Sequence, residues 1–367
     1  MNHFDQYNMK LSQFKFRLPE ELIAQYPSPY REDARLMVLH RKSGEIEHKL
    51  VRDMVAYFGE GDVFVFNDTK VFPARLYAKK EKTMANIEIF LLRELNHNLR
   101  YWDVLVDPAR KIRIGNKLFL DEDTTIVGEV IDNTTSRGRT IRFLTDYDNS
   151  EFKQYLYSLG NMPLPKYIRR PMEEDTKVEF EKVFPDMTVD ELDEERYQTV
   201  FAKNDGSVAA PTAGLHLTNS LIEKLKQCGH RFEKVTLHVG AGTFRPVSTD
   251  TIGEHQMHSE TIVVGRECIE NLINSSEKTI IPIGTTSMRT LESLYWIGVL
   301  LMEQGMDARR LHVEQWFPYQ DRKKLPSAKA SLQAVVDYLN KYQLNELQAT
   351  TALMIAPSYQ MRISKAL

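Results

Sequence analysis

Four short segments of this chain share one form, an apolar run that ends in small or polar residues. They are residues 67–69 (NDT), 210–216 (APTAGLH), 238–245 (HVGAGTFR) and 284–290 (GTTSMRT). In open α/β sheets, ligands collect at the carboxyl ends of strands, where loops and helix N-termini meet. The four segments therefore predict a ligand site at one edge of a sheet.

The last segment combines a glycine with hydroxyl side chains and an arginine. Gly284 lets the backbone turn sharply out of the strand, and a hydroxyl at 285–287 can cap the helix that follows. A helix N-terminus suits a phosphate or a carboxylate, to which Arg289 would add a bidentate contact. The alternative is that a threonine only caps the helix and Arg289 is a surface charge. Because the P-loop lysine is absent, we do not expect a nucleoside triphosphate site.

Two glycines, Gly240 and Gly242, stand where a backbone must approach something closely. They make a weak dinucleotide fingerprint, because the third glycine of that pattern falls at Arg245. The chain also lacks a methyltransferase pattern of strand, glycine loop and downstream acid. A nucleoside would therefore be bound in a manner of its own.

Histidines are the candidates for proton transfer, because only histidine titrates near neutrality unaided. His216 and His238 flank the predicted strand ends, and His255 and His258 follow in a polar stretch. A lone histidine is more often structural, so the pattern alone does not choose a base. The spacings match no zinc site, and we expect no metal.

Composition leaves the partner open. The chain has 367 residues, 42% hydrophobic and 27% charged, which is ordinary for a soluble globular protein of about two domains. It has no apolar run of ~18 residues and no signal peptide, so we expect no membrane span and a location in the cytosol. Two cysteines without metal-ligand spacing fit that reducing compartment.

The charge pattern is equally undecided. A net charge of −3 argues mildly against a protein that coats nucleic acid non-specifically. Three basic stretches, residues 75–82, 110–117 and 166–170, could still form a local patch, although each alone is more often a solvated face. Residues 195–199 (ERYQT) combine charge, an aromatic ring and an amide, which suits stacking on an unpaired RNA base or, equally, a surface strand.

The middle of the chain differs in texture from both ends. Short alternating segments between turn residues predict a small antiparallel β-barrel over residues 75–150. Apolar strands at 62–66, 235–239 and 279–283, with helices at 218–228 and 290–304, predict an α/β domain. We therefore expect a mixed-sheet α/β domain built from residues 1–74 and 151–367, with the barrel inserted.

These segments, in this order, resemble the S-adenosylmethionine:tRNA ribosyltransferase-isomerase family of queuosine biosynthesis. The stretches that carry the resemblance are residues 16–39, 62–76, 102–115, 160–170, 195–202, 206–218, 235–247, 255–260 and 283–293. They are long, specific and nearly continuous from Met9 to Gly305.

The resemblance implies a reaction that transfers and isomerises the ribosyl group of S-adenosylmethionine. The acceptor is the aminomethyl group of a 7-deazaguanine at the tRNA wobble position, and epoxyqueuosine-tRNA, adenine and methionine are the products. The sulfonium acidifies the neighbouring ribose carbon, so a modest base can start the reaction. The expected partners are S-adenosylmethionine as cosubstrate and tRNA, with no permanently bound cofactor, no metal and no membrane.

The resemblance also implies roles for residues at the strand ends. We expect His216 as the base, with His238 as second choice. Residues expected to contact S-adenosylmethionine are Asp68, Thr212, Gly240, Gly242, Glu260, Thr285, Thr286 and Arg289. Residues expected to contact RNA are Lys166, Arg169, Arg170, Arg196 and Tyr197. Nothing in the pattern decides the oligomeric state, and we expect a monomer.

The sequence departs from the family at several points. Leu217, Met288 and the pair at 84–85 replace residues common in the family, and residues 306–345 are divergent. The family continues past a late strand that resembles residues 353–363, whereas this sequence ends at Leu367. We therefore expect the C-terminal family segment to be absent and the chain to be truncated. The alternatives are a non-catalytic tRNA-binding relative and a transferase that uses another nucleoside or phosphosugar.

Overall fold

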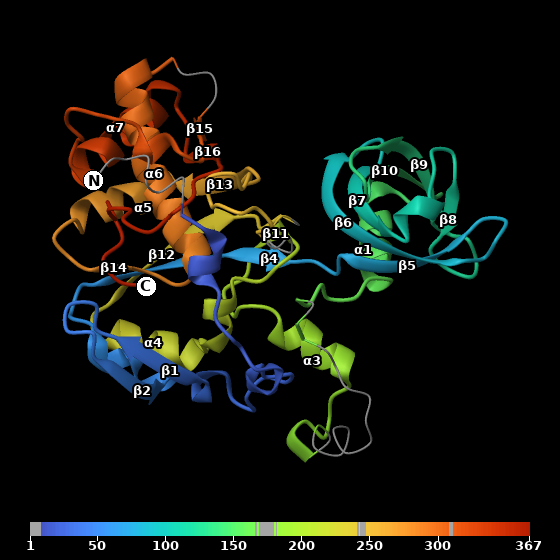
Figure 1. Cartoon of the computed structure of the whole chain (residues 1–367), viewed down its shortest axis with the longest axis horizontal. Coiled ribbons are helices and arrows are strands. Elements are labelled where there is room, and N and C mark those ends of the chain that lie inside the picture. The colour runs from blue at the N-terminus through green and yellow to red at the C-terminus, as the bar shows by residue number, and fades with distance from the viewer. Residues whose placement is uncertain are drawn as a thin grey trace.

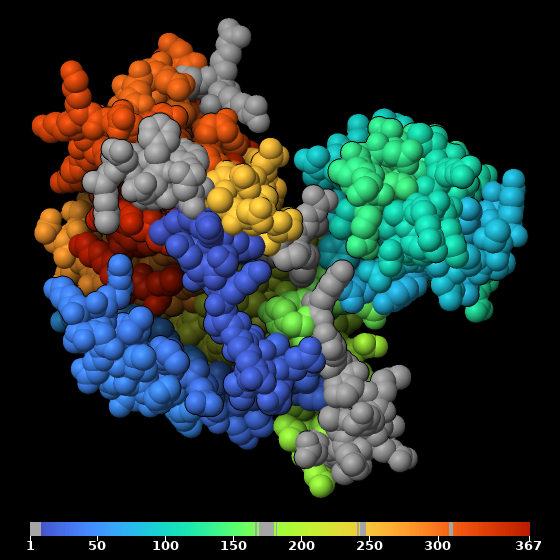
Figure 2. Space-filling model, in the orientation of Figure 1, coloured from blue at the N-terminus to red at the C-terminus, as the bar shows by residue number. Residues whose placement is uncertain are grey.

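The chain folds into an α/β body and a separate β-barrel lobe (Figures 1 and 2). The computed structural model describes residues 9–165, 167–168, 180, 182–240, 242, 247–307 and 311–367. The barrel leaves the body after β4 (Thr69–Val71) and stands to one side of it. This arrangement confirms the predicted fold class, a mixed-sheet α/β domain with an inserted antiparallel barrel.

The body is built on a six-stranded sheet in the order β14-β3-β12-β13-β16-β15. Its strands are β3 (Val63–Asn67), β12 (Arg231–Leu237), β13 (Glu260–Gly265), β14 (Ile280–Pro282), β15 (His312–Val313) and β16 (Glu346–Thr351). Strand β13 pairs antiparallel with both of its neighbours, and the other pairs are parallel. Five strands therefore run in one direction, so their carboxyl ends meet at one edge with the start of β13.

Strand β3 is buried on both faces, as its continuous apolar run predicts. Val63 and Val65 join the larger core under α5 (Arg266–Asn274), α6 (Thr285–Gln304) and α7 (Ala328–Lys341). Phe64 and Phe66 join a second core with α4 (Asn219–Gln227). The period of two along the strand thus sends alternate side chains into two different cores.

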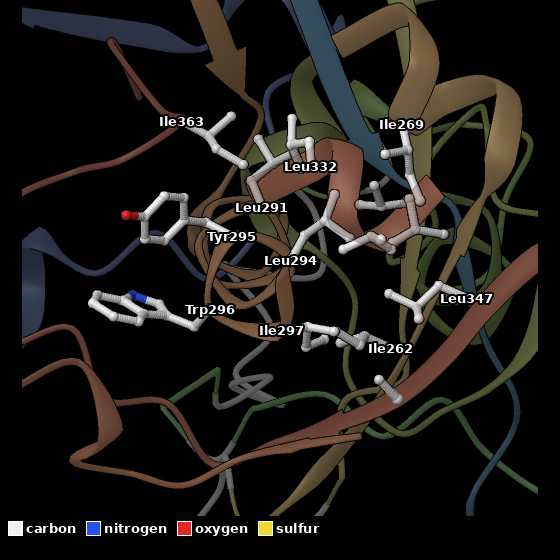
Figure 3. Close-up of a cluster of buried hydrophobic side chains, with 14 of the residues drawn as sticks. Ile262, Ile269, Leu291, Leu294, Tyr295, Trp296, Ile297, Leu332, Leu347 and Ile363 are labelled. Carbon is white, nitrogen blue, oxygen red and sulfur yellow. The ribbon is translucent and has the colours of Figure 1, made fainter. Parts of the chain in front are cut away.

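Helix α6 is buried on all sides between Thr290 and Leu301. Its Leu291, Leu294 and Ile297 pack with Ile269 of α5 and other apolar side chains of the larger core (Figure 3). A helix that is apolar all round belongs in a core, and here it lies between the sheet and α7. The helix starts directly after Gly284, five residues earlier than the sequence pattern indicates, and ends at Gly305 as predicted.

The lobe is a closed antiparallel barrel in the order β10-β7-β6-β5-β8-β9. Its strands are β5 (Arg75–Lys80), β6 (Asn86–Asn96), β7 (Tyr101–Asp107), β8 (Lys117–Phe119), β9 (Val127–Asn133) and β10 (Gly138–Leu144). Helix α1 (Asn149–Ser158) adds Phe152 and Leu156 to the barrel core. The boundary predicted at residue 150 therefore falls within a helix that packs on the barrel.

Smaller elements surround these two units. They are the hairpin β1 (Arg35–Leu39) and β2 (Ile46–Leu50), the parallel pair β4 and β11 (Asn204–Ser207), α3 (Val189–Arg196) and the 3₁₀ helices η1 (Leu11–Phe14), η2 (Glu20–Leu22), η3 (Arg31–Asp33), η4 (Val51–Tyr57), η5 (Ala109–Lys111), η6 (Thr212–His216) and η8 (Phe317–Tyr319). Within the described ranges, no helix combines the length and the apolar character that crossing a membrane requires.

A buried carboxylate fastens the last residues of the chain to α6. Glu292 has no exposed surface and accepts hydrogen bonds from the backbone amides of Arg362, Ile363 and Ser364, at 2.8 to 3.1 Å. The Tyr359 hydroxyl donates a fourth bond, at 2.9 Å. Together the four donors satisfy a group whose burial would otherwise be costly.

Gly298 lies where α6 touches α7, and substitution there tests this packing. A Cβ added at Gly298 would stand 2.1 Å from the backbone oxygen of Ser331, so the helices would have to separate. We expect Gly298→Ala to lower the free energy of unfolding by about 2 kcal/mol or more, measured by urea denaturation.

Gly265→Ala is the matched control, because nothing lies within 4 Å of a Cβ added there. It should cost at most about 1 kcal/mol, the value of an altered helix N-cap. Equal losses in the two variants would contradict the packing described for Gly298.

Candidate functional site

The described residues of the four polar segments meet at one edge of the sheet. Asn67 ends β3, His238 follows β12 and Gly284 follows β14. Helix η6, which belongs to segment 210–216, lies at the same place. A Cβ added at Gly284 would stand 3.3 Å from Cβ of Ala213 in η6. The parallel strands thus bring together residues that are more than 200 positions apart in the chain.

Asn67 ties these strand ends together. Its Nδ2 donates to the backbone oxygen of Leu237 at 3.1 Å and to Oγ1 of Thr286 at 3.2 Å. Its Oδ1 accepts from the amides of Leu237, at 3.0 Å, and of Thr69, at 3.2 Å. The residue is completely buried, so all four bonds are protected from water. Sequence reasoning quoted this asparagine within its motif but predicted only the neighbouring Asp68 as functional.

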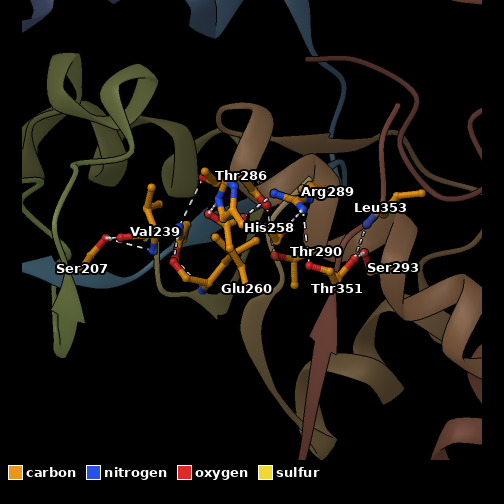
Figure 4. Close-up of polar contacts among 12 residues, drawn as sticks. Ser207, Val239, His258, Glu260, Thr286, Arg289, Thr290, Ser293, Thr351 and Leu353 are labelled. Carbon is orange, nitrogen blue, oxygen red and sulfur yellow. Dashed lines mark hydrogen bonds and ion pairs between the residues drawn. The ribbon is translucent and has the colours of Figure 1, made fainter. Parts of the chain in front are cut away.

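A buried ion pair lies beside this junction (Figure 4). The Glu260 carboxylate, only 4% exposed, pairs with Nη1 of Arg289 and lies 3.0 Å from Nε2 of His258. Nη2 of Arg289 donates to the backbone oxygens of His258, at 3.4 Å, and Thr351, at 3.3 Å. Burial lowers the pKa of Arg289, whereas the charge of Glu260 opposes that shift. Both terminal nitrogens of Arg289 thus bond protein atoms, and a bidentate contact of Arg289 with a ligand stays a prediction.

His258, one of the two candidate histidines without a predicted role, lies at this ion pair. Its Nδ1 would lie 2.0 Å from a Cβ added at Gly242, so no larger residue fits there without moving the ring. The close approach predicted for Gly242 is thus made to a protein side chain. A Cβ at Gly240 would meet no described residue within 4 Å. In the sequence, a role for His258 could be inferred from its place in the HQMHSE stretch, two residues before Glu260.

The N-terminus of α6 has no side-chain cap. The N-cap is Gly284, at φ 90°, and the expectation that a hydroxyl at 285–287 caps the helix is wrong. The Thr286 hydroxyl accepts from Asn67, and the Ser287 hydroxyl donates to the backbone oxygen of Ile283 at 3.0 Å. Because φ is positive at Gly284, the chain enters the helix without a residue placed to cap it. The first amides of α6 therefore remain as donors at the sheet edge.

A cavity of about 440 Å³ opens beside β12 and β13. Its lining residues are Asp68, Asn204, Asp205, Lys234, Thr236, His238, Val263, Gly265 and Glu346. Oδ1 of Asp68 accepts from Oγ1 of Thr236 at 2.6 Å and from Nδ2 of Asn204 at 3.0 Å. Three carboxylates against one lysine make the cavity suited to a ligand with positive charge. A larger opening, of about 730 Å³, lies at one end of the barrel, away from the carboxyl ends of the strands in the body.

His238 lines the acidic cavity in a fixed orientation. Its Nδ1 lies 2.9 Å from Oγ1 of Thr69, and its ring packs against Gly206, where a Cβ would stand 2.9 Å from Nδ1. Burial lowers the pKa of His238 more than the charges of Asp68 and Asp205 raise it. The imidazole is therefore neutral near pH 7 and able to accept a proton.

His216 lies elsewhere, at the end of η6, and keeps contact with solvent. Partial desolvation, followed by the charges of Arg31 and Arg196, lowers the pKa of His216. Thr212 is exposed at the start of the same 3₁₀ helix. Cationic side chains act on His216 and carboxylates act on His238, so the two predicted bases have different electrostatic environments.

The residues expected to contact RNA divide into two groups. Lys166, Arg169 and Arg170 lie outside the described residues. Arg196 ends α3, where its guanidinium donates to the backbone oxygens of Pro29, at 3.1 Å, and Ser28, at 2.7 Å.

Tyr197 is 5% exposed, so its ring packs inside the body and has no free face for a base in this conformation. The alternative of a surface strand is wrong, because the segment leaves a helix. Arg31 also donates to the backbone oxygens of Glu195, Gln198 and Leu215, at 2.7 to 3.0 Å. Arg31 of η3 therefore joins residues 195–198 to η6.

Comparison with known proteins identifies the family of this chain. The family profile described as queuosine biosynthesis protein matches residues 11–367. The chain belongs to this family.

Within the described part of the chain, no group of three or more His, Cys, Asp and Glu side chains is placed to hold a metal ion.

Curated relatives carry the name S-adenosylmethionine:tRNA ribosyltransferase-isomerase. Those of Phocaeicola vulgatus and Flavobacterium psychrophilum are each 54% identical over 287 residues, which cover 78% of this chain and 77% of the relative. A solved structure of an S-adenosylmethionine tRNA ribosyltransferase from Thermotoga maritima is 25% identical. The alignment covers 92% of this chain and 99% of that chain, with a TM-score of 0.33.

Replacement of Glu260 tests the buried ion pair. Glu260→Gln leaves the Arg289 guanidinium buried opposite a neutral amide, and we expect the free energy of unfolding to fall by about 3 kcal/mol. The measurement is urea denaturation at pH 7. Glu223→Gln is the control, because Glu223 pairs with Lys226 at 2.6 Å on the surface of α4, where such a pair contributes less than about 1 kcal/mol. Similar losses in both variants would show that the buried pair has no special weight.

Proposed function

We propose that this chain is an S-adenosylmethionine:tRNA ribosyltransferase-isomerase. It transfers and isomerises the ribosyl group of S-adenosylmethionine onto 7-aminomethyl-7-deazaguanine at the tRNA wobble position, and epoxyqueuosine-tRNA, adenine and methionine are formed. The observation that carries the proposal is the family match over residues 11–367, with relatives of that name at 54% identity. Its location in the cytosol and its monomeric state stay predictions.

The charges of the cavity suit the cosubstrate. S-adenosylmethionine carries a positive sulfonium, and the carboxylates of Asp68, Asp205 and Glu346 line the opening. Both hydrogen bonds that described residues make to the Asp68 carboxylate use Oδ1, which leaves Oδ2 as the acceptor for a ribose hydroxyl. Because Thr236 and Asn204 hold this carboxylate, it needs no rearrangement to bind a ligand.

The carboxylate of the methionine moiety would bind away from the acidic side chains of the cavity, at the N-terminus of α6. The uncapped N-terminus of α6, with Thr285 and Thr286, offers amide donors and partial positive charge for it. The backbone at Gly240 would lie against the nucleoside. Glu260 accepts from Arg289 and contacts His258, so in this proposal it positions those two residues. A ligand hydroxyl could donate only to a carboxylate lone pair that these contacts leave unused.

His238 is the base that the geometry favours. The positive sulfur acidifies the adjacent ribose carbon, and a neutral imidazole in the cavity wall can take the proton from it. The sulfur then leaves as the neutral thioether of methionine, and adenine leaves from the ribose. His216, the first choice from the sequence, remains the alternative base because its pKa is also lowered, although it lies at the surface.

Adenine release tests the proposed reaction. Incubation of the protein with S-adenosylmethionine and tRNA that carries 7-aminomethyl-7-deazaguanine should release one adenine per modified base, measured by chromatography. The same tRNA with guanine at the wobble position is the control and should release none. Folded protein that binds the modified tRNA without releasing adenine would contradict the enzymatic proposal and indicate a binding-only relative.

The identity of the base gives a second test. We expect His238→Asn to lower kcat/KM by about 10² to 10⁴, because a general base contributes a factor of that size. In the native protein, kcat/KM should stay level below pH 6.5 and fall only when the pH drops through the lowered pKa of His238, since protonation removes the base.

Two further histidine variants show whether a loss of activity is specific to His238. His97→Asn alters an exposed barrel histidine and should leave kcat/KM unchanged. A large loss in His216→Asn, together with near-native activity of His238→Asn, would transfer the role of base to His216.

A further inference from the structure

Strand pairing in the barrel brings two basic stretches of the chain together. Lys79 and Lys80 of β5 lie opposite Phe119 and Leu118 of β8. The amide of Glu81 then donates to the backbone oxygen of Lys117 at 2.9 Å. The basic residues near the end of β5 thus become neighbours of those that precede β8, across about 30 positions of sequence.

The resulting surface, here called the barrel basic surface, carries an excess of unpaired positive charge. Its members are Lys79, Lys80, Lys82, Arg110, Lys111 and Arg113. All except the half-buried Lys80 are exposed, and no ion pair between described residues includes any of the six. Glu81 is the one acid within these stretches. Five net positive charges on a chain with a net charge of −3 indicate an anionic partner.

Protein contacts fix the turn that bears three of these charges. Nζ of Lys80 donates to the backbone oxygen of Lys111 at 2.7 Å. The buried guanidinium of Arg139 donates to the backbone oxygens of Ala109, at 2.8 Å, and Ile112, at 2.9 and 3.2 Å. Because these oxygens belong to η5 and the residue after it, Arg110, Lys111 and Arg113 are presented from a held backbone.

An aromatic ring accompanies the charge. Tyr77 is 57% exposed and shares the outer face of β5 with Lys79, two residues along the strand. A basic surface with an exposed ring suits nucleic acid, whose phosphates bind cations and whose bases stack on aromatic side chains.

The position of the barrel basic surface in the fold indicates how far its ligand must extend. Residue Arg75 is held next to Asn161, at the connection to the body, and β5 runs from there away from the body (Figure 1). The barrel basic surface therefore lies toward the far end of the lobe. It is apart from the strand-end site, the name used here for the carboxyl ends of β3, β12 and β14 with the N-terminus of α6. Only an extended polyanion can reach both places.

We propose that the barrel basic surface binds the phosphate backbone of tRNA outside the base that reacts. This inference rests on the proposed function, because the strand-end site and the barrel then hold one RNA molecule. The cations contribute affinity and orientation, and they take no part in the chemistry.

The test neutralises three charges and measures tRNA binding as a function of salt. The variant combines Lys79→Gln, Lys111→Gln and Arg113→Gln, all exposed. Each phosphate contact contributes about 0.9 to the slope of log Ka against log salt, so the slope should become shallower by about 2 to 3. Affinity at low salt should fall by about tenfold or more, whereas kcat at saturating tRNA should stay native.

The control carries the same loss of charge elsewhere. Lys323→Gln, Lys324→Gln and Lys329→Gln remove three exposed lysines from the body, and this variant should keep the native slope. An unchanged slope in the barrel variant, or equal changes in both variants, would overturn the inference. Salt-dependent binding of the barrel surface to phosphatidylserine vesicles, with native tRNA binding in the barrel variant, would overturn it in favour of a membrane.

The wild-type protein separates this inference from the proposed function. If it binds tRNA and releases adenine while the barrel variant keeps the native slope, only the barrel inference fails. If the wild-type protein neither binds tRNA nor releases adenine, the proposed function fails, and the barrel inference fails with it.

Discussion

The site depends on one side-chain amide, that of Asn67. Its hydrogen bonds join the end of β3 to the end of β12 and to the first turn of α6. Each of these three elements leads into a polar segment, so the amide fixes the distances between the segments. A buried amide with all its bonds made inside the protein holds such a junction more rigidly than exposed contacts could. Asp68, His238 and Thr286 take their places from that junction.

Buried charged side chains in this fold serve mainly to position other groups. Glu260 and Arg289 hold His258 at the sheet edge, and Glu292 holds the final segment of the chain against α6. Arg139 does the same for the basic turn of the barrel. A buried charge is costly and contributes little net stability even when paired, so its value lies in geometry. All four therefore mark places where the fold has to hold a loop in one conformation.

The division into a body and a barrel lobe matches a reaction on a large substrate. The cavity beside β12 and β13 carries three carboxylates and one lysine, whereas the outer surface of the barrel carries an excess of positive charge. Opposite charges at one place would screen each other. Separation into two lobes lets each surface keep its own sign, which the proposed function on a large RNA substrate requires.

Local patterns in the sequence were enough to predict the fold class, the inserted barrel and the polar segments that lie at the sheet edge. Those features depend on local patterns: the continuous apolar run of β3, the alternation in the barrel strands, and glycines such as Gly284 where the chain must turn. The ends of α4, which stops just before Gly229, and of α6, which stops before Gly305, follow from the same local chemistry, because both glycines have positive φ.

The partners of the polar side chains became apparent from the three-dimensional structure. It showed that Thr286 receives a bond from Asn67 and does not cap α6, that Tyr197 is buried, and that His258 shares Glu260 with Arg289. It also brought Lys80 and Lys111 together across the barrel. The physical reason is that such contacts join residues far apart in the chain, and a pattern of spacing along the sequence contains no information about which distant partner a side chain meets.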